Sequence, residues 1–113
     1  MNYSIVIPIY KRGEIIQNCL KSISEQSLKP CEIIIVDNNV DIEDSNILRN
    51  NVNDFKLNNN INIRILSSPK NSGAIARNIG ASVSVGEIIA FLDSDVILDK
   101  NYYKTLINYF ERL

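Results

Sequence analysis

The chain has 113 residues, of which 45% are hydrophobic, so it fits one domain with a substantial apolar core. Its 12 basic and 13 acidic residues give a formal charge of −1, which argues against broad binding to nucleic acid or to a membrane surface. The absence of histidine excludes a Ser-His-Asp or Cys-His nucleophile and any histidine-bound metal within these residues. Any chemistry here must rest on carboxylates, Arg, Lys, Tyr and backbone groups.

The sequence carries no targeting signal that we recognise. It runs directly into a strand-like apolar segment without a preceding basic region, and no apolar stretch approaches the ~20 residues needed to span a bilayer. We therefore expect a cytoplasmic protein. Cys19 and Cys31 lack the spacing of a metal or CxxC site, which predicts two reduced thiols that pack as small apolar residues.

The first half of the chain alternates strand and helix patterns. The predicted elements are strands over residues 4–10 and 32–37 and helices over residues 13–26 and 41–57. The first strand should end near Pro8, because proline cannot donate a hydrogen bond within a sheet. The second strand ends in Asp37 and precedes the turn-forming pair Asn38-Asn39. In the second helix the apolar positions are Ile47, Leu48, Val52 and Phe55.

The second half repeats this alternation. The predicted elements are strands over residues 63–66 and 87–92 and helices over residues 74–85 and 101–113. Gly86 is a good terminator for the helix before the last strand, and Asp99 is a good N-cap for the final helix. We expect Ala76, Ile79 and Val83 to face inward from one helix, and Tyr102, Leu106, Tyr109 and Phe110 to share one side of the other.

The last predicted strand stops abruptly at two carboxylates. The apolar run from Ile88 to Leu92 predicts a strand buried on both faces, with Asp93 and Asp95 just past its carboxyl end. Open parallel sheets bind ligands at that edge, and two oxygen donors without histidine suit Mg²⁺ or Mn²⁺. Such a cation would bridge the protein to a phosphorylated ligand. A D-x-D sequence also arises by chance and caps helices, and this alternative stays open.

The alternation predicts an α/β fold in which residues 1–113 form one unit. We expect an open, mostly parallel sheet in strand order 3-2-1-4 with helices on both faces, because right-handed crossovers leave few other topologies. In that order the crevice lies at the carboxyl ends of the first and fourth strands. Residues 8–10, Asp37 and the pair Asp93 and Asp95 would then meet at one edge.

Three further residues have both a functional and a plain interpretation. Tyr10 would stack on a planar base or pack on the first helix, and Asp37 would accept a hydrogen bond from a base or form a turn. Arg77 would brace Asp37, contact a nucleotide or lie on the surface. No glycine-rich phosphate loop follows the first strand, so Arg, Lys or a metal would have to meet phosphate charge.

Four motifs in this order resemble the N-terminal half of family 2 glycosyltransferases with the GT-A fold, a Rossmann-like half-domain. The matching pieces are residues 4–12, 32–38, 71–73 with 76–80, and 89–95. The resemblance implies an enzyme that moves a sugar from a nucleotide-sugar, most often UDP-linked, to an acceptor hydroxyl with inversion. It implies that Pro8 and Tyr10 line a pocket for the base, that Asp37 binds the uracil edge, and that Asn71, Gly73 and Arg77 complete the wall of this base pocket. It also implies that Asp93 and Ser94 contact the ribose and that Asp95 binds Mg²⁺ or Mn²⁺.

The resemblance also indicates which parts to expect elsewhere. In the family the general base is an aspartate of the C-terminal half, so we expect it beyond residue 113 and expect the isolated chain to be inactive. We assign no catalytic residue, donor sugar or acceptor. A strand exposed at residues 87–93 would favour self-association. The alternatives are an inactive nucleotide-binding or interaction remnant and, less favoured without a glycine-rich loop, a sugar-phosphate nucleotidyltransferase.

Overall fold

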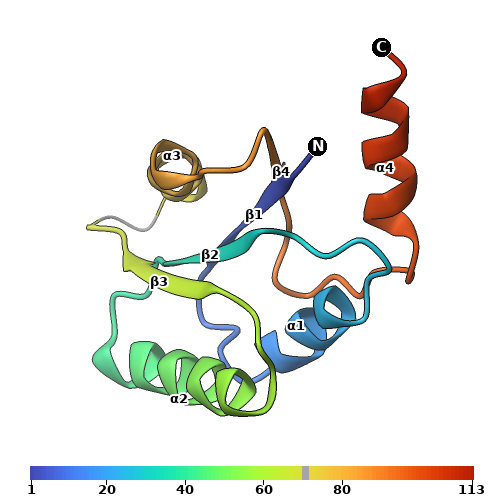
Figure 1. The fold of residues 1–113 in the computed structure, drawn as a ribbon. Coiled ribbons are helices and arrows are strands. Elements are labelled where there is room, and N and C mark those ends of the chain that lie inside the picture. The colour runs from blue at the N-terminus through green and yellow to red at the C-terminus, as the bar shows by residue number, and fades with distance from the viewer. Residues whose placement is uncertain (70–71) are drawn as a thin grey trace.

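The structure is a computed structural model that describes residues 1–69 and 72–113. Strands and helices alternate along these residues, as predicted (Figure 1). The elements are β1 (Tyr3–Ile9), α1 (Ile16–Ser24), β2 (Glu32–Asp37), α2 (Ile42–Asn58), β3 (Ile63–Ser67), α3 (Gly73–Val83), β4 (Ile88–Phe91) and α4 (Tyr102–Glu111). None of the helices in the described ranges has the length and apolarity required to cross a bilayer.

The strands form one parallel sheet in the order β3-β2-β1-β4, which confirms the predicted topology. β1 pairs with β2 as far as Ile9 opposite Asp37. Its pairing with β4 ends earlier, at Val6 opposite Phe91, and the backbone N–H of Leu92 still donates to the Val6 carbonyl at 3.0 Å. Pro8 therefore lies beyond the β1–β4 ladder, where its missing N–H costs nothing.

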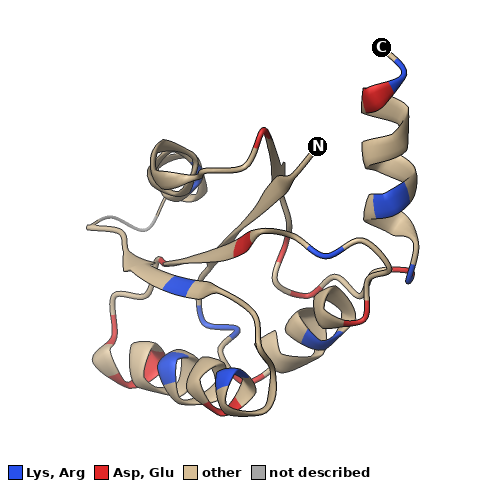
Figure 2. Cartoon of the chain, viewed as in Figure 1, with Lys and Arg blue, Asp and Glu red and all other residues tan. Residues whose placement is uncertain are grey.

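Helices cover both faces of the sheet, again as predicted (Figure 1). Alternate residues of β1, such as Ile5 and Ile7, face the apolar side chains of α1, α2 and α4. On the other face Val6 packs with Ala76 of α3. Charged residues are spread over the helices, the loops and strands β2 and β3, and are not gathered in one segment (Figure 2).

A glycine lets α3 approach the sheet closely. A Cβ atom on Gly80 would lie 2.3 Å from Cγ1 of Val6 and 3.3 Å from Cγ2 of Val36, so no larger residue fits without a shift. Ala76 and Gly80 are the buried residues of this helix, and Ile79 and Val83 are partly buried against the sheet. The predicted inward face of α3 is confirmed.

A buried carboxylate fixes the connection between α3 and β4. Glu32 accepts hydrogen bonds on Oε2 from the Ser4 hydroxyl and the Val85 N–H, both at 2.7 Å, and on Oε1 from Arg64 at 3.0 Å. Burial raises the pKa of Glu32, but the hydrogen bonds and the charge of Arg64 outweigh it and hold the pKa below its usual value. Ser4 Oγ in turn accepts from the Gly86 N–H at 2.8 Å. This network sets where β4 begins.

The prediction that β4 is buried on both faces is wrong. Ile89 and Phe91 are 37% and 51% exposed, whereas Ile88 and Ala90 pack against the core from the opposite face. The cause is the position of β4 at the sheet edge, because α3 packs over β1 and β2 and does not extend over it. Ile47, one of the apolar positions that predicted helix α2, is also 41% exposed.

Helix α4 packs through a different side from the one predicted. Its buried residues are Tyr103 and Ile107, and the Tyr103 ring lies 4.6 Å from that of Tyr3. The residues expected to share one side of the helix, Tyr102, Leu106, Tyr109 and Phe110, are exposed apart from the partly buried Leu106.

The start of α4 is organised by a buried amide. The Gln26 side chain accepts from the Tyr103 N–H at 3.1 Å and donates to the Asp99 carbonyl. The prediction that Asp99 is the N-cap of this helix is wrong. That position is Asn101, whose N–H donates to the Asp99 carboxylate at 3.1 Å.

Candidate functional site

The residues proposed from sequence gather at the carboxyl edge of the sheet. Asp37 is the last residue of β2, and Asp93 follows β4 by two residues. Since β1 lies between these strands, their lateral separation is two strand spacings, about 10 Å. One nucleotide can reach both ends of that span.

A pocket of about 390 Å³ opens at this edge. Its lining residues are Pro8, Tyr10, Arg12, Asp93, Ser94 and Asp95. Tyr10 is 41% exposed, so a face of its ring is accessible and not fully packed on α1. The arrangement places an aromatic ring and two carboxylates around one space, which suits a planar base and a cation-bound phosphate group.

The Asp93–Asp95 segment is a tight turn held by the core. The Val96 N–H donates to the Asp93 carbonyl at 3.2 Å, and Ser94 between the two carboxylates is buried. Below the turn, the Cys19 thiol contacts the same carbonyl at 3.9 Å. Burial, with a smaller contribution from the Asp95 charge, raises the pKa of Cys19 to about 12. The turn therefore presents both carboxylates to solvent above an uncharged thiol.

Asp37 is only 3% exposed and does not line this pocket. Its Oδ1 accepts from the Asn39 N–H at 2.9 Å, which is the turn-forming role considered from sequence. Its Oδ2 lies 3.8 Å from Arg49 of α2. Sequence analysis considered Arg77 as the brace for Asp37, but the cation beside this carboxylate is Arg49.

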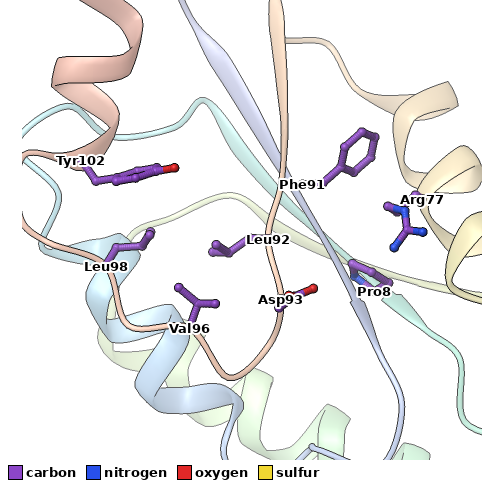
Figure 3. Close-up of a pocket in the computed structure, with 8 residues that line it drawn as sticks. All are labelled: Pro8, Arg77, Phe91, Leu92, Asp93, Val96, Leu98 and Tyr102. Carbon is purple, nitrogen blue, oxygen red and sulfur yellow. The ribbon is translucent and has the colours of Figure 1, made fainter.

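A second pocket, of about 310 Å³, lies along the free edge of β4 (Figure 3). It shares Pro8 and Asp93 with the first pocket and adds Arg77, Phe91, Leu92, Val96, Leu98 and Tyr102. Arg77 and Phe91 lie on one side of the β4 strand, and Leu98 and Tyr102 lie on the other (Figure 3). Arg77 thus points toward the edge where the predicted ligand site lies, and forms no ion pair within residues 1–69 and 72–113.

Gly73 is the first residue of α3 and lies against Arg77. A Cβ atom at Gly73 would be 3.4 Å from Nη1 of Arg77, which is ordinary contact, and its φ is not positive. Gly73 therefore does not adopt a left-handed conformation. Ser72 caps the helix instead, accepting from the Ile75 N–H at 3.4 Å. Asn71, the other candidate in this loop, lies outside the described residues.

Arg12 is the pocket residue that sequence analysis did not single out. Its Nη1 lies 3.3 Å from Oδ2 of Asp95, so it pairs with the carboxylate predicted to hold a metal. In the sequence it lies shortly after β1, at the end of the matching piece 4–12, and neither position assigned it a role.

The carboxylates of Asp93 and Asp95 fit Mg²⁺ or Mn²⁺ that is also bound by a ligand's phosphate groups. In the described part of the chain, no three carboxylate or thiol groups converge as a complete metal cage. Asp93 and Asp95 offer carboxylate oxygens at an open pocket, and Mg²⁺ is commonly bound by one or two carboxylates plus substrate phosphates and water. The residues therefore fit a cation that arrives with a phosphorylated ligand.

Comparison with known proteins identifies the family. The profile of Glycosyl transferase family 2 matches residues 4–113. The chain belongs to this family. Glycosyltransferase GlyG of Streptococcus pneumoniae serotype 4 is 35% identical to it over 109 residues, a match that covers 91% of this chain and 33% of GlyG.

Solved structures have the same fold. Staphylococcus aureus TarS 1-349 in complex with UDP-GlcNAc superposes with a TM-score of 0.76 at 25% identity, covering 99% of this chain and 32% of that one. The mannosyltransferase PcManGT from Pyrobaculum calidifontis, in complex with GDP-Man and Mn²⁺, gives 0.75 at 20% identity, covering 97% and 31%. This family 2 chain thus spans about a third of the length of GlyG and of the TarS 1-349 and PcManGT chains.

Proposed function

We propose that this chain is the donor-binding part of a metal-dependent, inverting glycosyltransferase that uses a UDP-sugar. The observation that carries the proposal is the pocket at the carboxyl edge of the sheet, where Pro8 and Tyr10 meet Asp93 and Asp95. The family match over residues 4–113 and the UDP-GlcNAc bound to TarS support a nucleotide-sugar as its ligand.

In this proposal each residue binds or orients one portion of the donor. Tyr10 and Pro8 contact the base, and Asp37 accepts from the uracil N–H at the end of β2. Asp93 and the Ser94 backbone bind the ribose. Gly73 and Arg77 of α3, together with Asn71, complete the wall of the base pocket.

Asp95 would hold Mg²⁺ or Mn²⁺ on the diphosphate. When bound, the cation neutralises the charge that develops on the leaving diphosphate. In the transfer, the acceptor hydroxyl oxygen forms a bond to the anomeric carbon from the face opposite the diphosphate, and the bond from that carbon to the diphosphate oxygen breaks. A general base takes the hydroxyl proton, and we propose that it lies outside residues 1–113.

Calorimetric titration of UDP, GDP and dTDP, each with and without Mn²⁺, tests this function. We expect UDP to bind only with Mn²⁺ and Asp95→Ala to abolish that binding. The matched control is Asp54→Ala, an exposed carboxylate on α2 far along the chain from the pocket. No nucleotide binding under any metal condition would contradict the proposal and favour a remnant that serves only in interactions.

We further propose that the free edge of β4 pairs with a second copy of the chain. Ile89 and Phe91 are exposed on an edge strand, and unpaired strand edges recruit other strands. Light scattering at rising concentration should detect a dimer that Ile89→Lys abolishes. Ile97→Lys, at a site 71% exposed and outside β4, should leave it intact. A monomer at all concentrations would contradict the pairing.

A further inference from the structure

Arg12 supplies the positive charge of the pocket that contains Asp93 and Asp95. Among the described residues that line this pocket, it is the one cationic side chain. Its guanidinium reaches Asp95 through a single contact of 3.3 Å, and the two side chains are 55% and 52% exposed. The pair is therefore open to water and held by one hydrogen bond, so it can be exchanged for another partner.

The backbone on either side of Arg12 is fixed much more firmly than its side chain. Lys11 has a positive φ of 63°, and its N–H donates to Oδ1 of Asn39 at 2.6 Å. On the other side, a Cβ on Gly13 would lie 2.8 Å from the backbone nitrogen of Leu48, so Gly13 packs directly against α2. The fold thus holds the Arg12 backbone in place and leaves its side chain able to move.

The neighbouring Lys11 contacts the Tyr10 ring and forms no ion pair with Asp95 among the described residues. Lys11 Nζ lies 5.6 Å from the centroid of the Tyr10 ring, in the position of a cation–π contact. Arg12 is thus the cation that the structure places against Asp95. A guanidinium carries five donors in a planar fork that matches phosphate oxygens, whereas an ammonium is a point charge.

We propose that Arg12 is a positioning residue with two alternative partners: Asp95 in the metal-free chain, and the diphosphate of the nucleotide once a divalent cation occupies Asp95. This inference rests on the proposed function. Arg12 competes with the cation for one carboxylate, and so metal alone binds weakly. When metal and diphosphate arrive together, the displaced guanidinium binds the phosphate oxygens, so nucleotide and metal bind cooperatively.

Three variants test this exchange: Arg12→Gln, Arg12→Lys and, as the matched control, Arg112→Gln at the exposed end of α4. Two quantities are measured for each: the affinity for Mn²⁺ alone by electron paramagnetic resonance, and the affinity for UDP at saturating Mn²⁺ by calorimetry. Circular dichroism verifies that the Arg12 variants remain folded.

The expected changes have opposite signs. Arg12→Gln should bind Mn²⁺ alone about two- to five-fold more tightly, the range for loss of an exposed ion pair. It should bind UDP with Mn²⁺ about ten-fold more weakly, because a charge-assisted hydrogen bond is lost. Arg12→Lys should resemble the wild type with Mn²⁺ alone and recover part of the UDP affinity. Arg112→Gln should change neither affinity.

Two results would overturn the inference. If Arg12→Gln leaves both affinities unchanged, as Arg112→Gln should, Arg12 is an ordinary surface residue and the proposed function still stands. If the wild-type chain binds no UDP with Mn²⁺, the proposed function fails together with this inference. The wild-type titration therefore separates the two failures.

Discussion

Removing the Glu32 carboxylate should destabilise the fold far more than removing its cationic partner. In Glu32→Ala the Ser4 hydroxyl and the Val85 N–H both lose their acceptor in the interior. Each unsatisfied buried donor costs about 1–3 kcal/mol, so we expect a loss of about 3–5 kcal/mol. A domain of this size has roughly 5–15 kcal/mol of stability in total.

Two companion variants separate the contributions. In Glu32→Gln the amide oxygen can still accept from Ser4 and Val85 while its NH₂ group faces Arg64, so the cost should be about 1–2 kcal/mol. Arg64→Gln should cost less than about 1 kcal/mol, because the Arg64 side chain is 42% exposed and water screens its charge. The stability of all three variants is measured from the midpoint of urea denaturation, after verifying that the slope m is unchanged.

The pH dependence gives an independent check. The pKa of Glu32 is lower in the folded chain than in the unfolded one, so the carboxylate stabilises the fold at pH values above the unfolded pKa of about 4.3. That stabilisation is lost as the pH falls through the folded value. The wild type should therefore approach Glu32→Gln in stability below about pH 4. A cost below 1 kcal/mol for Glu32→Ala, or a gap to Glu32→Gln that is as large at pH 3 as at pH 7, would refute the reasoning.

Three other predictions concern packing and thiol chemistry. Gly80→Ala should lower stability by about 1–3 kcal/mol in urea denaturation, because its new methyl group meets the β1 core, although alanine favours a helix. An unchanged midpoint would contradict the close approach of α3. Gly13→Ala should cost a similar amount, since the methyl group meets the α2 backbone, and a neutral result would show that this loop can move away. With an aromatic disulfide reagent, exposed Cys31 should react at once and buried Cys19, with its pKa near 12, only on unfolding; two fast thiols would contradict the structure.

The strand order could be predicted because it depends on the apolar periodicity of the sequence. Apolar runs alternate with helical periodicity, and right-handed crossovers then restrict the topology. This periodicity does not show which elements pack around each apolar segment in the fold. Residues 88–92 are as apolar as a central strand, and only the sheet edge leaves Ile89 and Phe91 in contact with solvent. The packing side of α4 was missed for the same reason, because the contact of Tyr103 with Tyr3 joins segments a hundred residues apart.

The candidate site likewise has residues that could be predicted from sequence and residues that could not. Topology alone brings Pro8, Tyr10 and the two carboxylates to one edge, and the structure groups them around one pocket. The arginines could not be assigned. Arg12 reaches Asp95 from the residue after Lys11, whose left-handed conformation no periodicity signals. Arg49 meets Asp37 because of the way α2 lies across the sheet, which depends on packing beyond the helix itself.

The last helix is attached to the rest of the fold through few buried contacts, and the Gln26 amide supplies two of them. One buried side chain holds both the Asp99 carbonyl and the first turn of α4, and beyond them the helix buries only Tyr103 and Ile107. Such a segment opens at a lower free energy than the sheet. Amide hydrogens of the last two turns of α4 should therefore exchange with deuterium well before those of β1 and β2, and Gln26→Leu should speed that exchange without altering protection in the sheet.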